Sequence, residues 1–197
     1  MVRSEEILGF WFGSPADPEW DSGRAVWFRP RHAFDAACRD RFGVEYEEAR
    51  FGRRDDWMED PRSCLALIVL LDQFPRNMFR GTPRTYESDA KALRTARHAV
   101  ASGFDQTLRP VERTFVYLPF EHSEDLDDQR RGVELMKGLS FHPKGAEWLG
   151  FAERHLKIVE RFGRFPHRNE ILGRASTAAE RAFLKEPNSS FLRMPTE

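Results

Sequence analysis

One stretch of this 197-residue chain decides its fold, Cys64-Leu65-Ala66-Leu67-Ile68-Val69-Leu70-Leu71. It follows Asp60-Pro61, and an aspartate cap with proline at the first helical position is typical of a helix start. Because the run has no polar face, we expect this helix at the centre of the domain. A helix that spans a membrane needs about 20 apolar residues, so this segment is predicted to be a core helix and no membrane partner is expected.

Helix signals recur on both sides of this stretch, whereas alternating strand patterns and hairpin turns do not. Caps, prolines and apolar spacing predict further helices over residues 4–12, 31–49, 88–102, 110–118, 123–139, 144–162 and 177–184. Phe74-Pro75-Arg76-Asn77 is expected to end the central helix, and Pro119 the helix that begins at Pro110. Short loops between such helices favour an all-α fold of stacked antiparallel hairpins. We expect one domain over residues 1–186 and a loosely ordered tail over residues 187–197.

The charge balance restricts the class of partner. Lysine and arginine total 31 against 32 acidic residues, and the formal net charge is -1. Proteins of nucleic acid or anionic lipid surfaces normally carry a basic excess, so neither partner is expected. Only five of the basic residues are lysines, which leaves 26 arginines. No secretory signal is expected, because two glutamates precede any apolar stretch. The two cysteines, Cys38 and Cys64, are interpreted as buried free thiols of a cytoplasmic protein.

Two segments of the chain resemble each other, residues 74–82 (FPRNMFRGT) and residues 165–174 (FPHRNEILGR). Both follow an apolar helix, contain Phe-Pro and Arg-Asn, reach a glycine and precede a Ser or Thr helix cap. We call them the first and the second corner. Their similarity leads to the hypothesis that they are equivalent turns of two similar helical hairpins. Chance is the rival explanation, since Phe, Arg and Pro are common in this chain.

Four stretches resemble a known bacterial family, the domain of unknown function 924. They are Ile7-Leu8-Gly9-Phe10-Trp11-Phe12-Gly13, residues 71–82, Tyr117-Leu118-Pro119-Phe120-Glu121-His122-Ser123-Glu124 and residues 161–169. The resemblance covers nearly the whole chain and implies a tetratricopeptide-like, all-helical fold, although the tetratricopeptide consensus itself is absent. It implies no activity, because no reaction is established for the family.

The arginines of the two corners suggest a binding site. If the corners approach each other, guanidinium groups can grip a carboxylate or phosphate through paired hydrogen bonds. The leading hypothesis is therefore a groove that binds an anionic small molecule or an acidic peptide end. The residues assigned to that groove are Arg76, Asn77, Arg80, Glu121, His122, Glu124, His155, Arg164, His167, Arg168 and Asn169. The competing interpretation is a scaffold whose arginines pair internally with Asp72, Glu87, Asp89, Glu121, Glu124 or Asp125, which the balanced net charge favours.

A second class of function uses the histidines. His122, His155 and His167, with nearby carboxylates, would suit acid–base chemistry or a metal site, although their spacing matches no known ligand pattern. The catalytic residues, the metal and the cofactor stay unassigned. The aromatic N-terminal segment around Phe10-Trp11-Phe12 and the loop around Trp20 are candidates for a homodimer contact.

Overall fold

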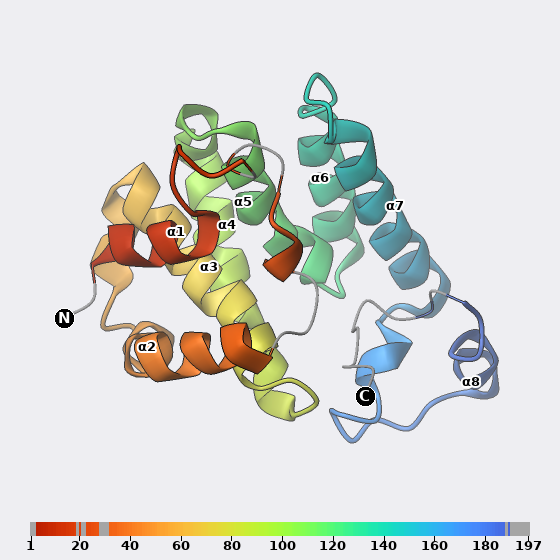
Figure 1. Ribbon diagram of the computed structural model, residues 1–197. Helices are drawn as coiled ribbons and strands as arrows, with labels where there is room; N and C mark the ends of the chain where they lie inside the picture. Colours follow the sequence, from red (N-terminus) through yellow and green to blue (C-terminus); the bar gives the residue numbers. More distant parts are fainter. Residues whose placement is uncertain (1–2, 19, 21–22, 28–31, 188, 190–197) are drawn as a thin grey trace.

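The computed structural model describes residues 3–18, 20, 23–27, 32–187 and 189, and the regular elements in these residues are all helices (Figure 1). The α-helices are α1 Ser4–Phe12, α2 His32–Arg50, α3 Pro61–Met78, α4 Asp89–Ala101, α5 Pro110–His122, α6 Leu126–Lys137, α7 Gly145–Phe162 and α8 Ala178–Phe183. The 3-10 helices between them are η1 Ala25–Trp27, η2 Asp55–Glu59, η3 Pro83–Tyr86, η4 Phe104–Thr107 and η5 Pro166–Arg168. The prediction of an all-helical fold is confirmed.

Helix α3 is the central element. It contacts α1, α2, α4 and α5, and each residue of the stretch 64–71 is at most 1% exposed. Asp60 caps its start by accepting the backbone N–H groups of Arg62 and Ser63. The prediction of a core helix is therefore confirmed. Among the residues that the structure describes, no helix is long and apolar enough to cross a membrane.

Consecutive helices from α2 to α7 pack against each other, as a chain of hairpins requires. Figure 1 shows α6 and α7 side by side at one end of the molecule, with α8 beyond the end of α7. This order is compatible with a tetratricopeptide-like arrangement, which stays a prediction. Of the predicted tail, residues 188 and 190–197 lie outside the described residues, as does Arg31, where the second helix was expected to begin.

The first corner does not end its helix, and that prediction is wrong. Helix α3 continues through Pro75 to Met78. Proline has no N–H to donate to the carbonyl four residues earlier, so Leu71 loses its helical partner. The hydroxyl of Ser88 replaces it and donates to the Leu71 oxygen at 2.6 Å. Helix α5 likewise continues past Pro119 to His122, where the sequence predicted an end at Pro119.

The second corner follows another backbone path. Gly163, with φ +67°, ends α7 in a left-handed conformation that glycine adopts without strain. Phe165 is then extended, with φ -91° and ψ 104°, and Pro166 opens η5. The corresponding residues of the first corner, Phe74 and Pro75, are α-helical. The hypothesis of equivalent corners is therefore wrong, because a left-handed glycine precedes only the second Phe-Pro.

The aromatic N-terminal segment belongs to the core. Trp11 is fully buried and Phe12 is 1% exposed, while the Phe10 ring stacks on Phe34 at 4.9 Å. The guanidinium of Arg109 lies over the Trp20 ring, with Cζ 3.6 Å from the ring centroid. A homodimer stays a prediction, and these rings are already packed within the chain.

Candidate functional site

The two corners meet through one arginine from each. Arg76, in the last turn of α3, forks onto Asp89 at the start of α4, with N–O distances of 2.8 and 3.0 Å. Arg168, in η5, reaches the same carboxylate at 3.4 Å. The ring of Tyr86 faces both guanidinium groups, with 5.8 Å from its centroid to Arg76 Cζ and 4.6 Å to Arg168 Cζ. We call Arg76, Tyr86, Asp89 and Arg168 the two-corner site.

Two hydrogen-bond donors of this site find no acceptor within the described part of the chain. Arg168 Nε and the Tyr86 hydroxyl oxygen are both buried and form no hydrogen bond with the residues that the structure describes. Arg168 is 7% exposed, and its other contacts are Asp89, the His122 main-chain oxygen at 3.0 Å and the Phe165 ring. An unsatisfied buried donor costs about 1–3 kcal/mol, so two such donors within one site are unusual.

The two guanidinium groups differ in how well their charge is compensated. Burial lowers the pKa of Arg76, but Asp72 and Asp89 outweigh burial, and the pKa is raised. For Arg168, burial prevails over the attraction of Asp89, and the pKa is lowered. The charge of Arg168 is therefore less well balanced by nearby carboxylates than the charge of Arg76.

A carboxylate–imidazole pair adjoins the two-corner site. Asp72, on α3, is 1% exposed, and its Oδ1 lies 2.7 Å from Nδ1 of His122 at the end of α5. Gln73 donates to the other oxygen of Asp72 at 2.6 Å. Burial would raise the pKa of Asp72, but Arg76 and His122 outweigh it and lower the pKa to about 2. Burial, aided by Arg76 and opposed by Asp72, lowers the pKa of His122. At neutral pH the pair is thus a carboxylate beside an uncharged imidazole.

A second carboxyl–imidazole pair lies next to the first. Glu121, on α5, is 1% exposed, and its Oε2 lies 3.3 Å from Nδ1 of His155 on α7. Burial, reinforced by Asp72, raises the pKa of Glu121 well above its ordinary value. Burial also lowers the pKa of His155 well below its ordinary value. The rings of His122 and His155 are 6.1 Å apart. In this second pair, burial therefore favours the uncharged form of both side chains.

The remaining residues of the second corner hold its loop in place. The Glu124 carboxylate accepts hydrogen bonds from Nη1 and Nη2 of Arg174, at 2.6 and 2.9 Å. It also accepts a hydrogen bond from the backbone N–H of Phe165. Asn169 accepts Arg174 Nε at 3.0 Å. Burial, with Arg168 adding to it, lowers the pKa of His167 to about 3. These contacts fix the position from which Arg168 enters the two-corner site.

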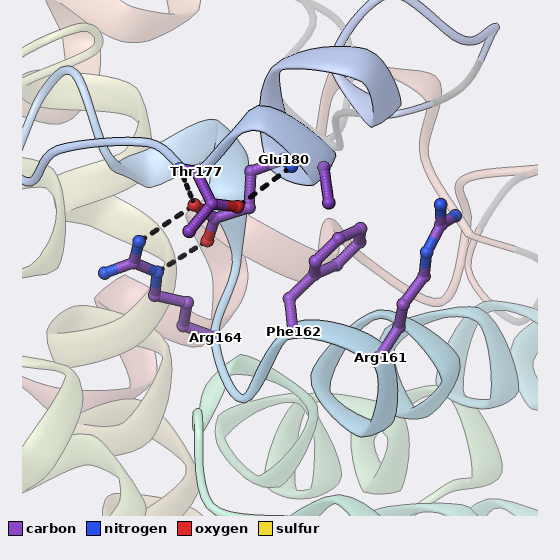
Figure 2. Close-up of a pocket in the computed structure, with 6 residues that line it drawn as sticks. Arg161, Phe162, Arg164, Thr177 and Glu180 are labelled. Carbon is purple, nitrogen blue, oxygen red and sulfur yellow. Dashed lines mark hydrogen bonds and ion pairs between the residues drawn. The ribbon is translucent and has the colours of Figure 1, made fainter.

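Other residues assigned to the groove lie in separate ion pairs. Arg80 and Asn77 both donate to Asp35 on α2, at 2.7 and 2.8 Å. Arg164 forks onto Glu180, which lines a shallow hollow between α7 and α8 (Figure 2). Internal pairing thus accounts for most corner arginines, and four of the six expected carboxylates take part. Arg76 pairs with Asp72 and Asp89, Arg84 with Glu87, Arg168 with Asp89 and Arg174 with Glu124.

The histidines do not assemble a metal site. Within the described part of the chain, no group of three or more His, Cys, Asp or Glu side chains is placed to hold a metal ion. His122 and His155 instead face separate carboxyl groups, Asp72 and Glu121.

Sequence reasoning missed Tyr86 as a member of the site and treated Asp72 only as a partner for arginine. Asp72 stands two residues before Phe74-Pro75, and Tyr86 lies in η3 just after the first corner. Proximity to the corner was therefore the available signal. That Asp72 meets His122 and that Tyr86 meets Arg168 of the second corner depends on helix packing, which no local pattern encodes.

Comparison with known proteins agrees with this architecture. The bacterial family of unknown function DUF924 matches residues 7–188. The chain belongs to this family. A similar solved structure is that of the protein of unknown function ATU0120 from Agrobacterium tumefaciens, which shares 42% sequence identity with this chain. The match covers 92% of this chain and 96% of that one, with a TM-score of 0.82. A search of curated proteins gave no match.

Proposed function

We propose that this DUF924 protein binds a small oxyanion, a carboxylate or a phosphate, at the two-corner site. The observation that carries the proposal is the pair of buried donors that have no acceptor among the residues that the structure describes, Arg168 Nε and the Tyr86 hydroxyl. An anion supplies the acceptor oxygens that both groups lack. Guanidinium groups suit this role because their planar donors match carboxylate and phosphate oxygens.

The charges around Arg168 support the same ligand. Asp89 already neutralises Arg76 through two short hydrogen bonds and reaches Arg168 only at 3.4 Å. A bound anion would supply the negative charge that the Arg168 guanidinium lacks. A free carboxylate, a phosphate and the C-terminal or acidic side-chain group of a peptide share this chemistry.

Isothermal titration calorimetry with sodium sulfate tests the proposal. Arg168→Lys keeps a positive charge but removes Nε, and we expect it to weaken sulfate binding about tenfold or more, the effect of a charge-assisted hydrogen bond. Tyr86→Phe removes one neutral donor, and a loss of about two- to tenfold is expected.

Arg80→Lys is the matched control, because Arg80 belongs to the first corner but pairs with Asp35. It is expected to bind sulfate as the unaltered protein does. If the protein did not bind sulfate, or if Arg168→Lys bound it equally well, the proposal would be wrong and the scaffold interpretation would hold.

A further inference from the structure

The hydrogen bond between His122 and Asp72 fixes which ring nitrogen carries the proton. The buried Asp72 carboxylate is a hydrogen-bond acceptor, so Nδ1 of His122, at 2.7 Å, must be the donor. In an uncharged imidazole the other nitrogen, Nε2, then has a lone pair and acts as an acceptor. Asp72 is itself held by Gln73, which keeps the ring in this orientation.

Nε2 of His122 is not fully buried. The side chain keeps 13% of its surface exposed, and Nε2 forms no hydrogen bond to the residues that the structure describes, yet it is not one of the fully buried atoms without a partner, so part of its surface is open. The main-chain oxygen of the same residue accepts Arg168 Nη2 at 3.0 Å, which places His122 directly beside the two-corner site.

The charged groups around the ring keep it an acceptor at neutral pH. Asp72 and Arg76 face it from α3, Asp89 from α4, His155 from α7 and Arg168 from η5. Burial and Arg76 hold the pKa of His122 below its ordinary value, so the lone pair on Nε2 is unprotonated near pH 7.

We propose that His122 makes the two-corner site selective for an oxyanion that also carries a hydroxyl group, and that Nε2 accepts the proton of that group. This inference rests on the proposed anion site and specifies its ligand: hydrogen phosphate, a protonated phosphate monoester or a hydroxy acid. Arg168 and Tyr86 bind the anionic oxygens, while the O–H group points at Nε2. If the proton transfers, the O–H bond breaks, its electron pair stays on the oxygen, and the new imidazolium faces the Asp72 carboxylate.

Sulfate and phosphate provide a direct test, because the two tetrahedral anions are similar in size but only phosphate keeps a P–O–H group at neutral pH. We expect calorimetry to show phosphate binding about tenfold or more tightly than sulfate, the effect of a hydrogen bond within a charged site. His122→Phe is expected to bind phosphate and sulfate with equal affinity.

The possible outcomes separate the two proposals. Equal binding of sulfate and phosphate by the unaltered protein would overturn the role of His122 and leave the anion site in place. Failure to bind either anion would overturn the anion site itself. Preference for phosphate that persists in His122→Phe would also contradict the role of His122.

The tautomer of His122 gives a readout that needs no stable variant. In ¹⁵N NMR spectra of the unaltered protein we expect a protonated Nδ1 and an unprotonated Nε2, and the opposite tautomer would overturn the proposal. Asp72→Asn is the positioning variant: its amide can donate to Nδ1 and move the proton to Nε2. We expect this variant to lose the preference for phosphate while it still binds sulfate, with its fold checked by circular dichroism.

Discussion

The two corners contain the same residue types but differ in backbone and in charge. Phe74-Pro75-Arg76 is helical, and the carbonyl left by Pro75 is satisfied by Ser88, 13 residues after the proline. Phe165-Pro166 follows the left-handed Gly163 and leads into η5. Three arginines near the first corner have close carboxylate partners, whereas Arg168 of the second corner shares Asp89 with Arg76. Similar residues therefore specify neither the same turn nor the same ion pairs, because each corner depends on contacts with distant parts of the chain.

Asp89 joins the two corners, and removing it is expected to have the largest effect. Asp89→Ala leaves Arg76 and Arg168 side by side without their common carboxylate, and we expect a loss of about 3 kcal/mol in the free energy of unfolding in urea. Asp127→Ala is the control, since Asp127 pairs with Arg130 at a surface position where it is 93% exposed. Its expected cost is below about 1 kcal/mol. Equal costs for both variants would show that Asp89 does not hold the corners together.

Ser88 tests how the first corner remains helical. Ser88→Ala leaves the buried Leu71 carbonyl without a donor and is expected to cost about 1–2 kcal/mol in urea unfolding. Pro75→Ala restores a backbone N–H that can donate to the same carbonyl. The double variant should therefore regain most of the loss, and additive effects of the two substitutions would contradict this explanation.

The two carboxyl–imidazole pairs should respond to pH in opposite directions. The pKa of Glu121 is raised in the folded state, so its contribution to stability is present below about pH 4.5 and is lost as pH rises. Glu121→Gln cannot ionise, and we expect its stability relative to the unaltered protein to increase by about 1 kcal/mol between about pH 5 and about pH 8.

Asp72 provides the contrast for this measurement. Its pKa is lowered to about 2, so its contribution is present above pH 3.8 and is lost as pH falls. The free energy of unfolding of Asp72→Asn should therefore fall below that of the unaltered protein by the largest amount at neutral pH and by the smallest amount in acid. Urea unfolding from about pH 2 to about pH 8 checks both variants, and parallel curves for them would contradict the assigned shifts in pKa.

The sequence predicted individual residues of the site better than their arrangement. Arg76, His122 and Arg168 were all candidates, and the structure brings them together because α3, α5 and η5 converge. Arg80, Asn77 and Arg164 were candidates for the same local reasons, but they point to Asp35 and Glu180. Arginine beside a turn is a local signal, whereas the carboxylate that it reaches is set by packing. Tyr86 was missed because a single tyrosine has no pattern of its own, and its place just after the first corner was the one signal available.

By itself, the sequence determined the all-helical architecture, because helix caps, apolar spacing and the fully apolar stretch 64–71 act through short-range chemistry. It also favoured internal pairing of the arginines, since acidic and basic residues are nearly equal in number. Only the tertiary structure decided that Asp72 orients His122 and that Arg168 Nε and the Tyr86 hydroxyl are buried without an acceptor among the described residues. Those properties depend on side chains that are 50 or more residues apart in the sequence or that lie on separate short helices. Burial makes such polar contacts stronger, because the protein interior screens charge less than water does.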